Sequence, residues 1–428
     1  MHILESSDMN FPGKLAGPVL LASAFAFTAA LSCSAPAQDL QASQASTRIE
    51  SIGEQQKEKA RNPLPAEPSK AEQLLYKYVG EDPLNKYLGG IPGLHLRLGG
   101  MPGGAGFSLG SEYFRPDLAK GQVHFRVSAI GSRRSWYLVD TELQFPHLAR
   151  RYLDLSFQGR RLDANSIDFY GPGPGSQKAG RTAYRREESV LDFSLAFRPV
   201  RRYLGVRFAA GYMWFNVGPG KSNELNSAEK QYTPVMAPGI DRQTNYLRIG
   251  MFLEMDSLDE KKDPHRGTHL LAKFSRLSDR KYDQYSFRQI DNSIEQYLPF
   301  FNRKRVIALR ARAVLSYPDA GSAVPFYMQP TLGGASDLRG YRHDRFYDDN
   351  IFLLNAEYRW EVFALMDAVF FADAGKVFHR DGDFNLKKCE SDVGFGVRFK
   401  TRRALVFRVD TAFSHEGFGL WFVFDHAF

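Results

Sequence analysis

The chain has 428 residues, a formal net charge of +8 and an aromatic content of 14%. This length suits two ordinary domains or one large barrel. With 34 Phe, 20 Tyr and 37 Gly, the composition favours strands and tight turns over helices. Lys and Arg are spread along the chain without a dense basic run, so nucleic acid is not expected as a partner. Two cysteines are too few for a disulfide framework or a zinc-type cysteine cluster.

The N-terminal segment, residues 1–37, has the pattern of a secretory signal peptide. A basic residue precedes a small apolar stretch at 15–32, and Ala35-Pro36-Ala37 forms an A-x-A cleavage site. Two acidic residues precede the apolar stretch, which suggests that translation begins at Met9. A membrane anchor and a lipoprotein attached through Cys33 are the alternatives that stay open.

Residues 38–93 are polar and contain many Gln, Glu, Lys and Pro residues, which predicts a periplasmic linker. A short helix is expected within it, from Lys70 to Val79. After the cleavage site no run of 18 or more apolar residues remains, which excludes helical membrane spans. If this chain lies in a membrane, only a closed barrel pairs every backbone group internally.

Apolar and polar residues alternate with a period of two from Leu94 to the C-terminus. In the stretch 191–198, for example, Leu and Phe alternate with Asp, Ser, Ala and Arg. Sixteen candidate strands of 9 to 14 residues fit between 94 and 428, at roughly 21 residues per strand and turn. The sequence therefore predicts an all-β fold, a 16-stranded antiparallel transmembrane β-barrel over residues 94–428. A soluble all-β protein with one polar face is the alternative.

The C-terminus continues this alternation to a terminal aromatic residue. The apolar positions are Leu420, Phe422, Phe424 and Phe428, with His426 where another aromatic is frequent. Outer-membrane barrels commonly end in this way, and the assembly machinery reads the last strand. We therefore expect a last strand that runs to the terminus, with Phe424 and Phe428 as its C-terminal signal.

Two motifs stand out in the last third of the chain. The first is Leu338-Arg339-Gly340-Tyr341, at the end of a glycine-rich segment, and the second is Phe371, Asp373 and Gly375 in an F-x-D-x-G pattern. Together they resemble the bacterial surface antigen, or BamA-type, outer-membrane assembly superfamily. In that family a [VIL]-R-G-[FY] tip of the sixth extracellular loop folds into the barrel lumen. The resemblance covers about residues 94–428 and implies a member that lacks the periplasmic POTRA domains.

Three charged residues are expected to meet inside the barrel. The alternation places Glu357 and Asp373 on the luminal face of neighbouring strands. An Arg339 carried inward by a loop needs such partners, because an unpaired buried charge is costly, and arginine can bind carboxylates bidentately. Gly340 allows a close backbone approach or a positive φ. The resemblance implies the same pairing, in which Arg339 locks the loop to the wall; three unrelated surface charges are the alternative.

The resemblance implies a bacterial outer-membrane protein that acts in outer-membrane protein assembly, insertion or translocation. Its expected partners are outer-membrane lipid, an unfolded barrel or secreted client, and a periplasmic partner protein. A passive or gated pore, an export channel for a partner, and a non-transporting surface antigen are the alternatives. No G-x-S-x-G elbow is present, so no enzyme is expected. No cofactor or metal is expected either, because His265 and His269 flank a turn rather than share a helix face.

The candidate first strand, 94–100, is short and has glycines on both sides. This pattern predicts a weak seam between the first and last strands. Such a seam opens sideways and templates an incoming strand. A closed barrel whose first strand merely begins after glycines is the alternative.

Overall fold

The computed structural model describes residues 92–200, 203–222, 224–261, 263–301, 304–363, 366–400, 405–424 and 428. The expected signal peptide, almost all of the expected linker and the helix expected at 70–79 lie outside these residues. Within the described part, no helix is long and apolar enough to cross a membrane.

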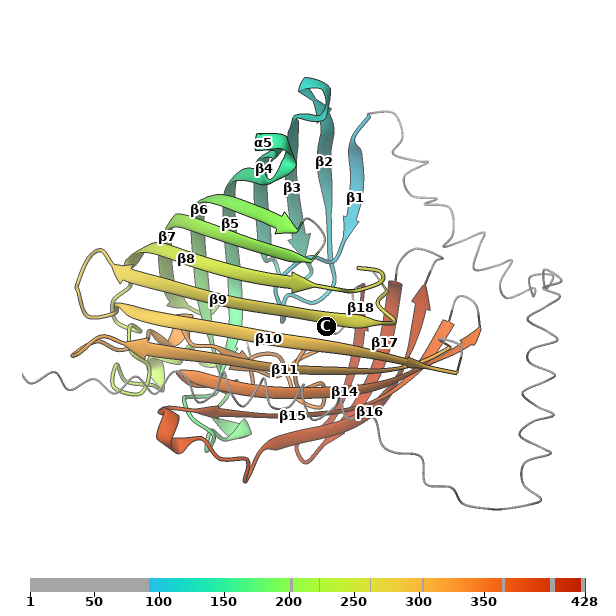
Figure 1. Cartoon of the computed structure of the whole chain (residues 1–428). Coiled ribbons are helices and arrows are strands. Elements are labelled where there is room, and N and C mark those ends of the chain that lie inside the picture. Colours follow the sequence, from blue (N-terminus) through green and yellow to red (C-terminus); the bar gives the residue numbers. More distant parts are fainter. Residues whose placement is uncertain are drawn as a thin grey trace, which may run out of the picture. The chain divides into compact units, whose positions relative to one another are not determined.

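Sixteen strands form one antiparallel sheet, as predicted (Figure 1). Sequence neighbours are neighbours in the sheet, except that β11 pairs with β14, while β12 and β13 form a small separate ladder. The strands are β1 (Leu94–Leu98), β2 (Ser108–Leu118), β3 (Val123–Ser132), β4 (Tyr137–His147), β5 (Leu153–Phe169), β6 (Thr182–Val200), β7 (Leu204–Pro219), β8 (Asn245–Asp256), β9 (Gly267–Asp279), β10 (Phe287–Phe300), β11 (Arg305–Pro318), β12 (Thr331–Leu332), β13 (Phe346–Tyr347), β14 (Asn350–Phe363), β15 (Met366–Phe378), β16 (Glu390–Lys400), β17 (Leu405–Ser414) and β18 (Gly417–Val423). The large sheet's strands contain from 5 to 19 residues, a wider range than expected.

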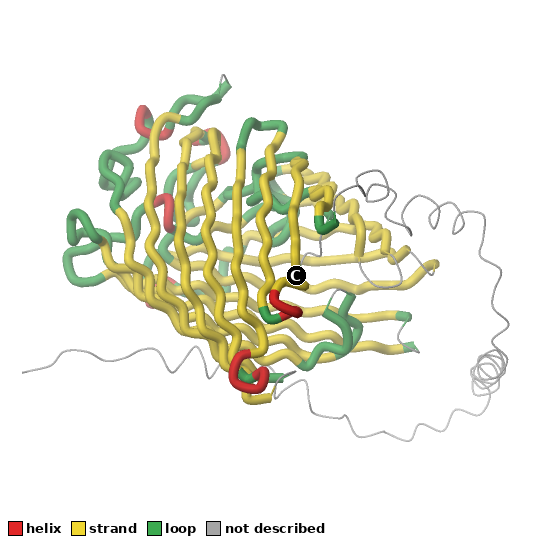
Figure 2. Tube along the Cα trace, turned by 90° about the horizontal axis from the view of Figure 1, so that it is seen from above, coloured by secondary structure: helices red, strands yellow, loops and turns green. Residues whose placement is uncertain are grey.

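The two ends of the sheet differ in the length of their connections. At one end lie the long segments 220–244 and 319–349, and at the other lie short connections such as residues 119–122 and the four-residue α5 (Leu148–Arg151). We call these the long-loop end and the short-turn end. Outer-membrane barrels show this asymmetry, with long extracellular loops and short periplasmic turns. Figure 2 shows the sheet curling around an interior that loops partly fill.

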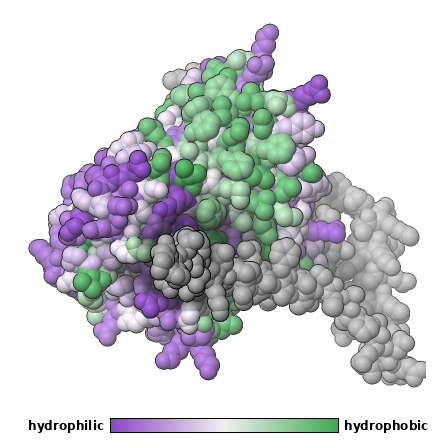
Figure 3. All heavy atoms as spheres, turned by 60° about the vertical axis from the view of Figure 1, so that its left-hand side comes forward, coloured by the Kyte–Doolittle hydropathy of each residue, from purple (hydrophilic) through white to green (hydrophobic). Residues whose placement is uncertain are grey.

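Side chains are distributed in the opposite way to those of a soluble protein. Leu191 and Phe208 on the outer face are 58% and 54% exposed, while Arg408 and Asp410 on the inner face are fully buried. Soluble proteins almost never bury charged groups fully while exposing a continuous apolar face. Figure 3 shows one broad apolar area of this outer surface. The distribution follows if lipid covers the outer face and the charged residues pair with one another inside.

The two edge strands are not joined side by side. Among the described residues, no ladder connects β1 to β18. Their ends approach each other instead, since a Cβ built on Gly99, after β1, would lie 3.8 Å from the Cβ of Phe424, after β18. In a flush antiparallel pair, the end of β1 would instead face the start of β18 at Gly417. β1 is therefore displaced along its own direction past the whole of β18 (Figure 1).

The last strand ends before the C-terminus, which corrects the expectation of a strand that runs to Phe428. β18 ends at Val423. Phe428 packs instead against the inner face of β10 and β11, where the hydroxyl of Tyr297 donates to its carbonyl oxygen over 3.3 Å and the guanidinium of Arg310 lies 4.9 Å from its ring. In the lumen the terminal residue meets an aromatic ring and a cation, which stabilise it there.

Candidate functional site: the inner loop and the strand seam

The segment between β11 and β14, residues 319–349, folds into the interior of the curled sheet, and we call it the inner loop. The ladder of β12 with β13 closes its tip, residues 333–345. Apolar side chains hold this tip to the wall, in a buried cluster made of Leu332, Leu338, Tyr341 and Phe346 from the loop and Val314, Ile351, Leu353 and Val377 from β11, β14 and β15. The inward-folded loop expected from the sequence is present.

The guanidinium of Arg339 lies between two carboxylates of the wall and is fully buried. Its Nε and Nη2 donate to the two oxygens of Asp373 at 2.7 and 2.8 Å, and its Nη1 donates to Oε1 of Glu357 at 2.6 Å. The structure thus brings together the three residues predicted to meet. The contact to Asp373 is bidentate, a geometry that lysine cannot reproduce.

Each residue of the F-x-D-x-G motif meets the inner loop, because β15 turns alternate side chains inward. The ring of Phe371 lies 3.4 Å from the guanidinium carbon of Arg339, as a cation–π contact. Asp373 pairs with the same guanidinium. A Cβ on Gly375 would lie 2.9 Å from a methyl carbon of Leu332, so glycine is needed there for space. The motif therefore forms a receptor for the loop tip.

Glu357 is the centre of a wider charge network that the sequence analysis missed. Besides Arg339, it accepts hydrogen bonds from Nε of Arg359 at 2.9 Å and Nη2 of Arg398 at 2.6 Å. Arg408 pairs with Asp410 and also donates to the carbonyl oxygen of Ala335 in the loop at 2.7 Å. The alternation marked these residues as luminal, but the pairing depends on strand register, which a single sequence does not give.

The motif residues after Arg339 attach the loop tip to β16 and β17. A Cβ on Gly340 would lie 2.6 Å from the Cβ of Asp392 and 2.8 Å from that of Ser414. Glycine is thus required for close approach, and Ser414 Oγ donates to its carbonyl oxygen at 2.8 Å. The Tyr341 hydroxyl donates to Glu390 Oε2 at 2.9 Å.

The loop tip also contacts β18, the strand at one side of the seam. Trp421 Nε1 donates to the carbonyl oxygen of Arg339 at 2.6 Å. A Cβ on Gly419 would lie 2.5 Å from that same oxygen, so the small residue lets β18 approach the loop. The arginine that pairs with the wall through its side chain therefore holds the last strand through its backbone.

His343 of the inner loop connects the two sides of the seam. Its ring packs edge-on against that of Trp421 on β18, with centroids 4.6 Å apart. On the other side, a Cβ on Gly103 in the β1–β2 connection would lie 2.6 Å from its Nδ1. Burial and the charge of Arg134 lower the pKa of His343 to about 4, so the imidazole is neutral at neutral pH. The loop thus contacts both sides of an edge that no ladder closes among the described residues.

Comparison with known proteins agrees with this architecture. The Omp85 superfamily domain matches residues 108–416. The chain belongs to the Omp85 superfamily. It is accordingly a bacterial outer-membrane protein, and the BamA-type resemblance seen in its motifs is confirmed. No curated protein sequence matches the chain.

Two solved structures show the same fold. BamA from Haemophilus ducreyi lacking POTRA domains 1–3 superposes with a TM-score of 0.59 at 14% identity, over 77% of this chain and 68% of that one. CdiB from Escherichia coli superposes with a TM-score of 0.52 at 14% identity, over 78% of this chain and 60% of that one. At this identity the likeness establishes the barrel fold of the Omp85 member.

Proposed function

We propose that this Omp85 member inserts unfolded outer-membrane β-barrel chains into the outer membrane. One observation carries the proposal: β1 and β18 are edge strands that no ladder joins among the described residues. An edge strand presents a row of unpaired N–H and C=O groups, which hydrogen-bond an incoming strand. The role assigned is non-enzymatic.

The lipid-facing surface of β18 supports this role. Phe418, Leu420 and Phe422 point outward and are 73%, 49% and 62% exposed. A client strand added to this edge would continue an apolar face into the bilayer while its backbone pairs with β18. The inner loop holds β18 in place through Trp421. The free edge of β18, which would pair with the client, therefore keeps its position while β1 remains displaced.

A disulfide across the seam tests the proposal. In a Cys33→Ser, Cys389→Ser background, cysteines replace Gly99 and Phe424, whose 3.8 Å Cβ separation lies within the roughly 3.5–4.5 Å that a disulfide spans. Purified protein in liposomes receives an unfolded barrel client, and client folding is followed by heat-modifiable gel migration. Because this disulfide holds β1 in its displaced position and leaves the outer edge of β18 free, we expect the reduced and the oxidised protein to accelerate client folding alike.

Two controls distinguish the effect of the disulfide at the seam from the effects of oxidation and of the new side chain at position 99. The pair Ala129→Cys with Val139→Cys joins register partners of β3 and β4, and its oxidation should leave insertion unchanged. The single variant Gly99→Cys measures the strain of a side chain at φ +74°. If oxidation of the seam variant abolishes acceleration while oxidation of the control pair does not, templating by β18 with β1 displaced is wrong.

The same liposomes test the alternatives retained from the sequence. Solute release that rises when Arg339→Ala frees the inner loop, without client folding, would favour a gated pore or export channel. The absence of both activities would favour a non-transporting surface antigen. A periplasmic partner protein that restores client folding would extend the proposal to a two-component system.

A further inference from the structure

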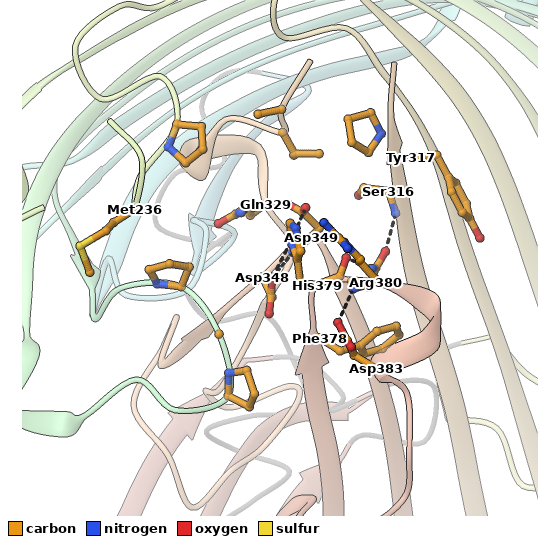
Figure 4. A pocket seen from close by; sticks show the side chains of 18 of the residues that line it. Met236, Ser316, Tyr317, Gln329, Asp348, Asp349, Phe378, His379, Arg380 and Asp383 are labelled. Atoms are coloured by element: carbon orange, nitrogen blue, oxygen red, sulfur yellow. Dashed lines mark hydrogen bonds and ion pairs between the residues drawn. The ribbon is translucent and has the colours of Figure 1, made fainter. Parts of the chain in front are cut away.

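A cavity of about 860 Å³ lies at the long-loop end, away from the Arg339 network (Figure 4). Its walls come from the β5–β6 loop, the β7–β8 loop, the inner loop and the β15–β16 connection. Much of the lining is apolar, including Pro172, Val235, Met236, Val324 and Phe378. Three side chains that can bind a metal ion also line this cavity.

These groups are Asp348 and Asp349 at the end of the inner loop and His379 directly after β15. One donor atom from each lies within 4.8 Å of the others. His379 Nδ1 is 2.9 Å from Oδ2 of Asp349 and 3.7 Å from Oδ1 of Asp348. Figure 4 shows the three side chains converging on one point at the cavity wall.

The carboxylates are deeply buried for two adjacent acids, with side-chain exposures of 5% for Asp348 and 7% for Asp349. Their one close basic partner among the described residues is His379, which is 63% exposed. The amine of Lys376 also lines the cavity, but it donates to Asn385 Oδ1 at 2.7 Å and to backbone oxygens of residues 385 and 387. Two buried negative charges beside one imidazole are costly unless a cation joins them.

One buried, unsatisfied oxygen beside the cluster points to a ligand. Gln329 donates through Nε2 to Oδ1 of Asp349 at 2.9 Å, while its Oε1 is buried and has no hydrogen-bond partner in the described structure. Oδ1 of Asp348 accepts from the backbone N–H of Asp349 at 2.9 Å. Native proteins rarely leave buried polar atoms without partners.

The donor groups are held in place by the backbone on either side. Asn350 Nδ2 donates to the carbonyl oxygen of His379 at 2.9 Å, and Asn350 Oδ1 accepts from the N–H of Ser316 at 2.8 Å. One side chain therefore fixes the spacing between the end of the inner loop and the start of the β15–β16 connection. A site supported in this way needs only side-chain rotation to close on an ion.

We propose that Asp348, Asp349 and His379 bind a divalent transition-metal ion of the Zn²⁺ class. Two carboxylates and an imidazole are a donor set that Zn²⁺ accepts, with metal–ligand distances of about 2.0–2.2 Å. The remaining coordination positions face the cavity and take water or a small ligand. The ion joins the last residues of the inner loop to the β15–β16 connection. It is thus a second attachment of the loop, in addition to that of Arg339 in the tip.

The test uses the full chain with Cys389→Ser, since that thiol lies in the same connection, and without an affinity tag that binds metal. Zn²⁺ binding is measured by titration calorimetry on chelator-treated protein in detergent. We expect one Zn²⁺ per chain, and at least tenfold weaker binding for His379→Ala and for Asp348→Asn with Asp349→Asn. Zn²⁺ should also slow proteolysis of the inner loop in the parent protein.

Asp383→Asn is the matched control, because Asp383 lines the same cavity but lies outside the three-residue cluster. It should bind Zn²⁺ as the parent does. His379 is exposed, so His379→Ala removes a donor with little effect on folding, which heat-modifiable migration verifies. No saturable binding, binding that survives His379→Ala, or equal loss in Asp383→Asn would each overturn the proposal. The outcome is independent of client insertion.

Discussion

The wall formed by β14 to β17 and the seam between β1 and β18 differ in how they are held. At the wall, neighbouring strands share continuous ladders, and buried carboxylates pair with Arg339 and with strand arginines. At the seam no ladder joins the described edge strands, and Trp421 and His343 provide the contacts through the inner loop.

The difference shows where this barrel resists opening. Backbone hydrogen bonds and desolvated ion pairs separate only if several interactions break together, whereas side-chain contacts at the seam break singly. The loop tip belongs to both regions, since the side chain of Arg339 lies in the wall and its carbonyl oxygen binds β18. Substitutions at the tip therefore show whether the wall and the seam are held independently of each other.

The largest effect is expected for Arg339→Ala, which leaves Asp373 and Glu357 buried without their shared partner. Breaking a buried pair costs about 3–5 kcal/mol, so the melting temperature should fall and the inner loop should become sensitive to protease. The control Arg312→Ala removes a luminal arginine that is 32% exposed and pairs with Asp291 instead of the loop. Unchanged melting and protease resistance in Arg339→Ala would show that the wall does not hold the loop.

Arg339→Lys should have an intermediate effect. The ammonium keeps the charge but cannot donate to both oxygens of Asp373 while reaching Glu357. Loss of a hydrogen bond to a charged group costs about 1.5–3 kcal/mol, measured as a shift of the denaturation midpoint. A lysine variant as stable as the parent would mean that charge alone, without bidentate geometry, holds the tip.

Trp421→Phe should affect the seam and spare the wall. It removes the hydrogen bond to the carbonyl oxygen of Arg339 and keeps an aromatic ring beside His343. A loss of about 1 kcal/mol corresponds to roughly fivefold faster amide hydrogen exchange in β18, with β14 and β15 unchanged. Trp360→Phe, on the outer face, is the control. Equal acceleration in β14 would contradict a separation between the two regions.

The smallest effect concerns Asp344 in the inner loop, whose Oδ1 accepts from Thr331 Oγ1 at 2.9 Å. Burial raises the pKa of Asp344 to about 6. Its folded pKa exceeds its ordinary value, so the ionised group costs stability above pH 6 and that cost disappears as the pH falls toward 4. Asp344→Asn should therefore melt slightly higher than the parent at pH 7.5, and the difference should shrink as the pH falls toward 4. A difference that grows on acidification would refute this assignment.

Sequence patterns were enough to predict the class of fold and the three residues that hold the inner loop, which are Arg339, Glu357 and Asp373. A period of two identifies the face of each strand, because successive side chains point to opposite sides, so the inward placement of Glu357 and Asp373 followed directly. The count of sixteen strands followed from the same alternation. The Arg-Gly and F-x-D-x-G motifs indicated the inner loop and its receptor.

The pairing of the luminal charges, and the absence of a ladder between β1 and β18 in the described part of the chain, follow from the three-dimensional arrangement of the strands. Arg398 reaches Glu357 from a different strand, so their contact depends on register and curvature across the sheet. The place of Phe428 beside Tyr297 and Arg310, beyond the end of β18 at Val423, likewise depends on contacts across the lumen. The cluster of Asp348, Asp349 and His379 depends on two loops meeting, which local patterns do not encode.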